Sequence, residues 1–405
     1  MNFNLFLLSI YLGLIFFEPQ QFFPFLENLR FTFSFGILVI FYSIINSPSD
    51  VKSNLVKSKI FWLTFILVII CFFSVFFNPS LNVNNFIESD LLKSFILFLI
   101  VVLLIKNESD FILLCWILII YTAIDAIVTI YFYHLGVLPT RLSSYFGGLG
   151  TSGSNEYATL MVMMLPFPII LQLTKRPKFQ KIFLITCTFA FLYCLTRTHS
   201  RAGFIGLMVI SLAFMYYKYF SYKQIIIATL FISLLFVKSP ASYFTRMESI
   251  SDKNTYEEDS NVTSRFDTYK EAIILIKENT CLGVGLGNYQ EYSRIRFSYP
   301  PYKGIYVPHN SPLTVGAESG IISLSLFILI ILFTFLQFKK LSRLENINDE
   351  LITDFFIFLK AANISVLGYA ILAMTLSIPY QRIFYILIAL AISSKKIISD
   401  KSNYL

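Results

Sequence analysis

His309 is the residue with the clearest capacity for chemistry in this chain of 405 residues, which has three histidines. It stands in the segment Val-Pro-His-Asn-Ser-Pro-Leu, directly before a long apolar run. Ser311 suits the N-cap of the helix expected there, and Pro312 suits its first position. His309 would then lie at the positive end of a membrane helix, which favours an uncharged imidazole. Such a group can accept a proton as general base. The alternative is a histidine that only bonds loop backbone.

Arginines form the second set of candidates. The short loops expected outside the membrane contain arginine as their only basic residue type, at Arg30, Arg141, Arg197, Arg201 and Arg382. A guanidinium binds phosphate or carboxylate through two parallel hydrogen bonds, which lysine cannot do. These arginines therefore indicate an anion site on the outer face. Chance and surface salt bridges are the alternative explanation.

A polar segment at 264–277 is predicted to form an amphipathic helix that carries a further arginine. Ser264 and Asp267 form a capping box, and Phe266, Tyr269, Ile273 and Ile276 recur on one face. Arg265 then lies in the first turn, where the helix dipole disfavours a cation, which suggests an anionic partner; a surface salt bridge is the alternative. The following Gly-Val-Gly-Leu-Gly-Asn-Tyr at 283–289 permits close backbone approach, and it matches neither a Rossmann motif nor a P-loop.

The elements that must position these residues are membrane helices. The chain is 56% hydrophobic and 14% charged, whereas soluble domains contain roughly 25% charged residues. Runs of about 20 apolar residues cross a bilayer. The sequence predicts an all-α, polytopic bundle of about twelve transmembrane helices. Its spans are placed at 3–17, 31–45, 60–77, 91–105, 111–133, 158–173, 182–196, 203–217, 224–237, 312–338, 355–377 and 383–394.

The distribution of basic residues predicts the orientation. Residues 1–405 are taken as one integral membrane domain, with a large periplasmic loop at 238–311 between spans nine and ten that contains short amphipathic helices. If both termini are cytoplasmic, the inner segments carry sixteen basic residues and the short outer loops carry the five arginines named above. The sixteen are Lys52, Lys57, Lys59, Lys106, Lys175, Arg176, Lys178, Lys181, Lys218, Lys223, Lys339, Lys340, Arg343, Lys395, Lys396 and Lys401.

Metal and disulfide chemistry find no support in the sequence. The three histidines lie at no ligand spacing from a cysteine or carboxylate, so no metal site and no cofactor are expected. Four of the five cysteines fall in apolar runs and Cys281 is alone in the large loop, which predicts no disulfide. Asp125 and Glu318 are buried acids within spans; Glu318 is expected to have a structural role.

Four segments in this order resemble the O-antigen ligase and polymerase superfamily of bacterial membrane glycosyltransferases, over about residues 140–335. Residues 141–158 resemble its Arg, Gly and Asn segment, although the usual proline before Asn155 is missing. Residues 196–207 are similar to its Ser-Arg-small-Gly motif. Arg265, the helix after it and the glycine repeat resemble its Arg-helix-Gly-x-Gly pattern. His309-Asn310 with Glu318 and Gly320 resembles its His-Asn…Glu-x-Gly signature.

The resemblance implies roles for these residues. Family donors are glycans linked to undecaprenyl diphosphate, and transfer inverts the anomeric centre outside the cytoplasm without metal or nucleotide sugar. His309 would be the general base, and Arg201 and Arg265 would hold the diphosphate. Candidates for substrate binding are Arg141, Asn155, Arg197, Asn310 and Arg382. From the residues alone, preorganised guanidiniums suit a leaving group that gains negative charge.

Three functions are compared. We favour a polymerase that joins lipid-linked repeat units of O-antigen or another surface polysaccharide; the alternative is a ligase that moves the glycan onto lipid A–core or a protein. A transporter is disfavoured because no paired intramembrane charges or internal repeat stand out.

The expected location is the bacterial inner membrane. Expected partners are the lipid-linked donor, a glycan or lipid A–core acceptor and the bilayer, with no nucleic acid; a flippase and a chain-length regulator stay open.

Overall fold

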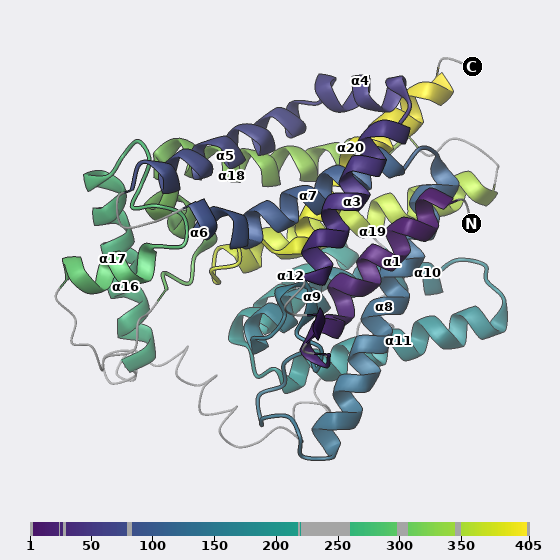
Figure 1. Cartoon of the computed structure of the whole chain (residues 1–405). Helices are drawn as coiled ribbons and strands as arrows, with labels where there is room; N and C mark the ends of the chain where they lie inside the picture. The colour runs from purple at the N-terminus through teal and green to yellow at the C-terminus, as the bar shows by residue number, and fades with distance from the viewer. Residues whose placement is uncertain are drawn as a thin grey trace.

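A computed structural model describes residues 3–23, 25–26, 30–78, 83–217, 219, 260–297, 307–344 and 350–402. Every regular element in these ranges is helical (Figure 1). The elements are α1 (Phe3–Phe17), η1 (Pro19–Gln21), α3 (Phe31–Asn46), α4 (Ser49–Lys57), α5 (Lys59–Phe76), α6 (Val83–Glu88), α7 (Asp90–Leu104), α8 (Glu108–His134), η2 (Gly148–Gly150), α9 (Ser154–Met164), α10 (Pro166–Gln172), α11 (Lys178–Arg197), α12 (Arg201–Tyr216), α16 (Ser260–Glu278), α17 (Tyr289–Arg296), α18 (Ser311–Leu341), α19 (Glu350–Ala373) and α20 (Arg382–Ser402).

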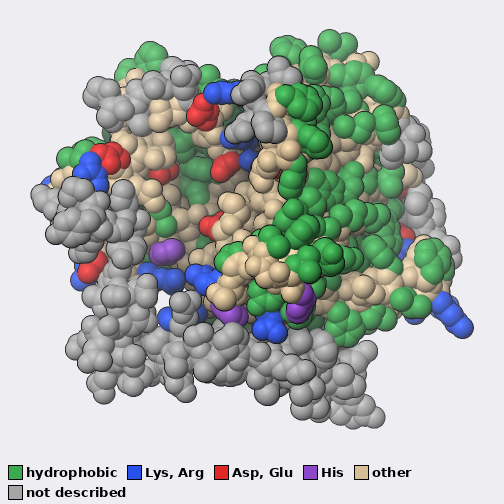
Figure 2. Space-filling view, turned by 60° about the horizontal axis from the view of Figure 1, so that its bottom comes forward, with side chains coloured by type: hydrophobic (Ala, Val, Ile, Leu, Met, Phe, Trp, Pro, Cys, Tyr) green, Lys and Arg blue, Asp and Glu red, His purple; other side chains and the backbone are tan. Residues whose placement is uncertain are grey.

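The all-helical membrane class is confirmed, whereas the count of about twelve spans is not. Among the described helices, six are long and apolar enough to cross a bilayer, or seven if the bent pair α3 and α4 counts as one span. The helices α1 and α12 are apolar but shorter. The predicted span at 224–237 lies outside the described residues. Figure 2 shows a broad hydrophobic surface on one side of the molecule, as lipid contact requires.

Most predicted spans coincide with a helix to within a few residues, and two of them, 158–173 and 312–338, are interrupted. The predicted span 158–173 is divided into α9 and α10, which meet at Leu165. Pro166 and Pro168 open α10. Each proline lacks a backbone donor and crowds the preceding turn, so a break at this point follows from the sequence.

The segments predicted to be cytoplasmic contact one another. Lys396 of α20 binds Asp50 of α4 at 2.6 Å and Asp400 at 3.0 Å. Arg176, between α10 and α11, forms a two-pronged ion pair with Asp354 of α19. The described residues predicted to lie outside also contact one another, at what we call the outer end: residues 18–23, 30, 141–155, 197–201, 307–310 and 374–382.

Helices α9, α12 and α19 pack closely through glycines and thereby position the outer end. A Cβ on Gly206 of α12 would lie 3.1 Å from Val162 of α9 and 3.2 Å from Leu372 of α19. A Cβ on Gly368 would lie 3.0 Å from Ile210. Since Gly206 faces Leu372 and Ile210 faces Gly368, α12 and α19 are antiparallel. The start of α12 is therefore level with the end of α19.

Helix α18 is interrupted where the glycine repeat docks on it. Gly320 has φ +87°, and the amide of Ile321 beyond it bonds the carbonyl of Thr280 at 2.9 Å. The amides of Val284 and Gly285 bond the carbonyls of Ala317 and Glu318, each at 2.9 Å. A Cβ on Gly320 would lie 2.3 Å from the Cys281 carbonyl oxygen, so glycine is required there. The repeat is thus a structural dock for the broken helix.

The helix predicted at 264–277 exists, but its start and its buried face differ from the prediction. Helix α16 already includes residue 260, so Ser264 is not its N-cap and Arg265 lies in the second turn. Of the predicted apolar stripe, Phe266 and Ile273 are exposed. The buried face instead comprises Thr268, Glu271, Ala272, Leu275 and Ile276. The prediction was right for Ile276, which packs with Ala272 and Leu275 against Tyr289 of α17 and Ala317 of α18, and wrong for Phe266 and Ile273.

Candidate functional site

His309 lies immediately before α18 in a strained backbone conformation, with φ +47°. Its side chain is half-buried. The Tyr269 hydroxyl of α16 donates to the His309 carbonyl oxygen at 3.3 Å. Burial and the nearby positive charge of Arg265 lower the pKa of His309 from 6.5 to about 4. The imidazole is therefore uncharged at neutral pH, close to Arg265, and not sealed in apolar packing.

Asn310 fixes the position of His309 relative to the end of α19. It is the N-cap of α18, with its side chain accepting from the Leu313 amide at 3.0 Å. Its Nδ2 donates to the Met374 carbonyl at 3.1 Å. The predicted N-cap, Ser311, is instead the first helical residue, and its hydroxyl donates to Leu376 at 2.7 Å. Asn310 thus has a positioning role, which its prediction as a substrate ligand did not include.

The turn between α11 and α12 brings together three other predicted residues. Ser200 is the N-cap of α12 and donates to Asn155 Oδ1 at 2.8 Å. The Nε of Arg141 donates to the Thr198 carbonyl at 3.4 Å. Arg201 opens α12 and is half-buried. The loop containing Arg141 and Asn155 is therefore held against the residues that flank Arg201.

Arg197 lies at the same turn but in a different environment. Its guanidinium lies 5.3 Å from the centre of the Tyr193 ring, a cation–π contact. The Tyr193 hydroxyl is 2.8 Å from Nε2 of His134. Arg197 is the last residue of α11, and its side chain packs on the Tyr193 ring of this aromatic pair. Its backbone carbonyl accepts a hydrogen bond from the Leu142 amide at 3.0 Å. Its backbone anchors the loop that contains Arg141.

The residues around His309 and those around Arg201 both lie near the end of α19. Arg201 begins α12, whose Gly206 faces Leu372, and Asn310 bonds Met374 two residues later. Arg201 and His309 are thus level at the outer end. Figure 2 shows Lys or Arg side chains next to a histidine on one face of the molecule.

A cavity of about 380 Å³ lies beside this junction. One wall is the 149–156 loop, including Ser152 and Glu156, and the other is the segment Ser377–Arg382. Ser377 is 2.9 Å from the Thr314 hydroxyl in the first turn of α18. We call this cavity the central chamber. It connects the α9 side of the site with the helix that begins after His309.

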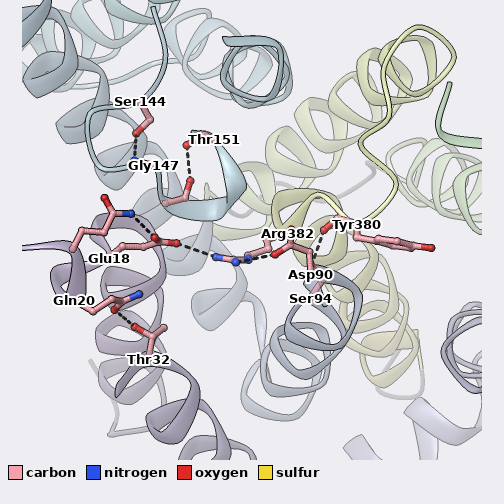
Figure 3. Close-up of polar contacts among 12 residues, drawn as sticks. Glu18, Gln20, Thr32, Asp90, Ser94, Ser144, Gly147, Thr151, Tyr380 and Arg382 are labelled. Carbon is pink, nitrogen blue, oxygen red and sulfur yellow. Dashed lines mark hydrogen bonds and ion pairs between the residues drawn. The ribbon is translucent and has the colours of Figure 1, made fainter. Parts of the chain in front are cut away.

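Arg382 lines the central chamber but has its charge matched by two acids. Its guanidinium lies 3.4 Å from Glu18 and 3.1 Å from Asp90 (Figure 3). The side chain is largely buried between α1 and α7. A guanidinium held by two carboxylates is poorly suited to bind a diphosphate. This environment argues against the predicted role of Arg382 as a substrate ligand. The Arg382 side chain instead ties three helices together.

Comparison with known families identifies the region that contains the candidates. Residues 186–328 match the family described as O-antigen ligase. The resemblance to the O-antigen ligase and polymerase superfamily is confirmed. No curated protein matches the chain. The matched region contains Arg197, Arg201, Arg265, His309 and Asn310, and it supports an enzyme of the membrane glycan-transfer type in a bacterial multi-pass protein.

Sequence reasoning missed several residues that build the site. Tyr269 bonds His309 and lies one turn after Arg265, a spacing that could have indicated a shared face. Asp125, which had no evident partner in the sequence, accepts from Ser144 at 2.6 Å and so holds the loop after Arg141. Ser200 had a detectable signal, because a serine directly before an apolar run suits an N-cap.

Proposed function

We propose that the protein transfers a glycan from undecaprenyl diphosphate to an acceptor hydroxyl at the outer face of the bacterial inner membrane, with both termini in the cytoplasm. The reaction inverts the anomeric centre and needs no metal. The observation that carries the proposal is an uncharged, half-buried His309 beside Arg265, within an O-antigen ligase family match.

His309 acts as the general base. In the proposed step, the acceptor hydroxyl gives its proton to the imidazole while its oxygen attacks the anomeric carbon. The bond from that carbon to the diphosphate oxygen breaks, and undecaprenyl diphosphate leaves with the electron pair. Attack from the side opposite the leaving group gives inversion. An imidazole with a pKa of about 4 is available for this step at neutral pH because it is unprotonated.

Arg201 and Arg265 bind the diphosphate, with Arg141 and Arg197 at its edge. Preorganised guanidiniums stabilise the charge that develops on the leaving group, and a partly buried site strengthens the effect. The diphosphate also brings negative charge next to Arg265. This charge offsets the influence of Arg265 on His309, so the pKa of His309 rises when the donor is bound, and the imidazole becomes a stronger base.

We favour polymerisation of repeat units of O-antigen or another surface polysaccharide, with ligation onto lipid A–core or a protein as the second candidate. Both use the same chemistry and differ only in the acceptor. The family description names a ligase, and the superfamily includes polymerases.

The test is transfer in liposomes that contain the purified protein and an undecaprenyl-diphosphate-linked repeat unit, without nucleotide sugar. Elongated glycan on the lipid indicates polymerisation, and transfer only to added lipid A–core indicates ligation. His309→Ala should reduce the rate by about 100-fold or more, the range of general base catalysis. The control Lys270→Ala removes an exposed side chain from the helix that contains Arg265 and should stay active. Undiminished transfer by His309→Ala would contradict the proposal.

A further inference from the structure

A second cavity, of about 600 Å³, lies at the outer end between α1, α3 and α7. Its polar lining consists of two carboxylates, three cations, two amides and one aliphatic hydroxyl, beside a few apolar side chains: Glu18, Glu88, Arg30, Lys93, Arg382, Gln20, Gln21 and Thr32. We call it the lateral chamber. Its volume lies in the range of ligand sites, about 300–1,000 Å³.

Arg382 is the wall shared by the lateral and central chambers. Its two ion pairs run to Glu18 and Asp90 (Figure 3). Glu18 lines the lateral chamber and Asp90 lines the central one. A glycan that occupied both chambers would therefore pass the Arg382 side chain. Its far end would reach Ser377, beside the first turn of α18. That path leads from the side of the bundle towards His309.

The chemistry of the lateral chamber suits hydroxyl groups. The Thr32 hydroxyl donates to Gln20 Oε1 at 2.6 Å, and Gln21 donates to Glu18 at 2.6 Å. Carboxylates accept hydrogen bonds from hydroxyls and amides both donate and accept, which fits a sugar. Two of the cations are already paired with these carboxylates, Arg30 with Glu88 at 2.9 Å and Arg382 with Glu18 at 3.4 Å. The lateral chamber thus offers paired charges, amides and a hydroxyl, which is a lining suited to a sugar.

The backbone provides independent support. Within the described ranges, the non-glycine residues with positive φ are Glu18, Arg30, Leu149, His199 and His309. All of them lie at the outer end, and Glu18 and Arg30 both line the lateral chamber. Such strained conformations cluster at binding and catalytic sites. The lateral chamber therefore shares this property with the region around His309.

We propose that the lateral chamber binds the acceptor glycan, with Gln20, Thr32 and Glu18 as hydrogen-bonding partners and Arg382 as a positioning residue between the two chambers. The proposal rests on the proposed function, because it assigns the acceptor of that reaction. Its ligand class is a hydroxyl-rich oligosaccharide without diphosphate.

The test is protection of an introduced cysteine, and it requires no transfer activity. Cys281 is the only exposed cysteine among the five of the chain, so Cys281→Ser gives a quiet background. Thr32→Cys and, as a matched control, exposed Lys270→Cys are added separately. Purified protein in detergent is labelled with a maleimide in the presence of oligosaccharide released from the host's own surface polysaccharide.

The oligosaccharide should slow labelling of Thr32→Cys and leave Lys270→Cys unchanged. At ten times the Kd the rate should fall about tenfold. Equal rates with and without oligosaccharide would overturn the proposal, as would protection by inorganic pyrophosphate or phospholipid vesicles alone. A Thr32→Cys variant that does not label at all would show a closed cavity and would also overturn it.

A kinetic measurement separates this inference from the proposed function. In the liposome assay, Gln20→Ala should raise the KM for the acceptor at least several-fold and leave the KM for the lipid-linked donor unchanged. Transfer by wild-type protein with no change in Gln20→Ala would refute only the lateral chamber. Protection of Thr32→Cys without any transfer would refute only the proposed reaction.

Discussion

At the scale of single residues, the site depends on a contrast between two charged environments. Arg265 lies near an imidazole that burial has already made hard to protonate. Arg382, by contrast, lies between Glu18 and Asp90. The same residue type thus stabilises an uncharged base in one place and joins helices in the other.

Arg201 provides a first prediction. Arg201→Lys keeps the charge but loses the planar fork that binds two phosphate oxygens, so transfer should fall by about 10- to 100-fold. The measurement is the transfer rate at saturating donor. Arg343→Lys, an exposed arginine after α18, is the control and should behave as wild type. A rate for Arg201→Lys equal to that of the control would show that Arg201 only opens α12.

At the scale of elements, the glycine repeat and the break in α18 form one unit. Three backbone hydrogen bonds join residues 280–285 to residues 317–321. The backbone amides of Gly287 and Tyr289 also interact with the Glu318 carboxylate. This agrees with the expected structural role of Glu318. The unit fixes the direction of the first turns of α18, and hence of His309.

Gly320→Ala should disrupt this unit. The new Cβ would lie 2.3 Å from the Cys281 carbonyl, and a positive φ costs alanine about 1–3 kcal/mol. The protein should unfold at lower temperature in detergent and lose transfer. Gly287→Ala is the matched control, since it has φ +75° but no atom within 4 Å of its Cβ. An unfolding temperature equal for both variants would mean that the steric contact has no effect.

The sequence predicted the helices better than their contacts. Apolar runs locate α5, α8 and α11 because hydrocarbon forces their composition. The docking of the glycine repeat on Gly320 was not predictable, because a contact between two backbones leaves no side-chain pattern. Likewise Arg382 looked like the other outer arginines, since its partner Glu18 lies 364 residues away in the chain.

At the scale of the whole molecule, the account requires that the candidate residues face the outside. Cys281 is exposed while the other four cysteines are buried. An impermeant maleimide should therefore label wild-type protein in intact spheroplasts and fail to label Cys281→Ser. Adding Lys178→Cys to that variant should restore labelling only after the membrane is permeabilised. Labelling of Lys178→Cys in intact spheroplasts would invert the topology.

The orientation stays a prediction from the sequence, which rests on counts of basic residues. The arrangement of residues within the outer end could not be predicted from the sequence. The positions of the central and lateral chambers depend on how α1, α7, α12 and α19 cross, which the order of the helices along the chain does not specify. The antiparallel contact of Gly206 with Leu372, together with the bond from Asn310 to Met374, brings the start of α12 level with His309.

The most direct test of the central claim is the pH dependence of kcat/KM for wild-type protein and Arg265→Gln. His309 must be unprotonated to accept the acceptor proton, so wild-type activity should be lost as the pH falls through about 4. Arg265→Gln removes a positive charge that lowers this pKa. Its residual activity should therefore be lost at a higher pH, between about 4 and the ordinary value of 6.5. An acid limb at the same pH in both proteins would contradict the account.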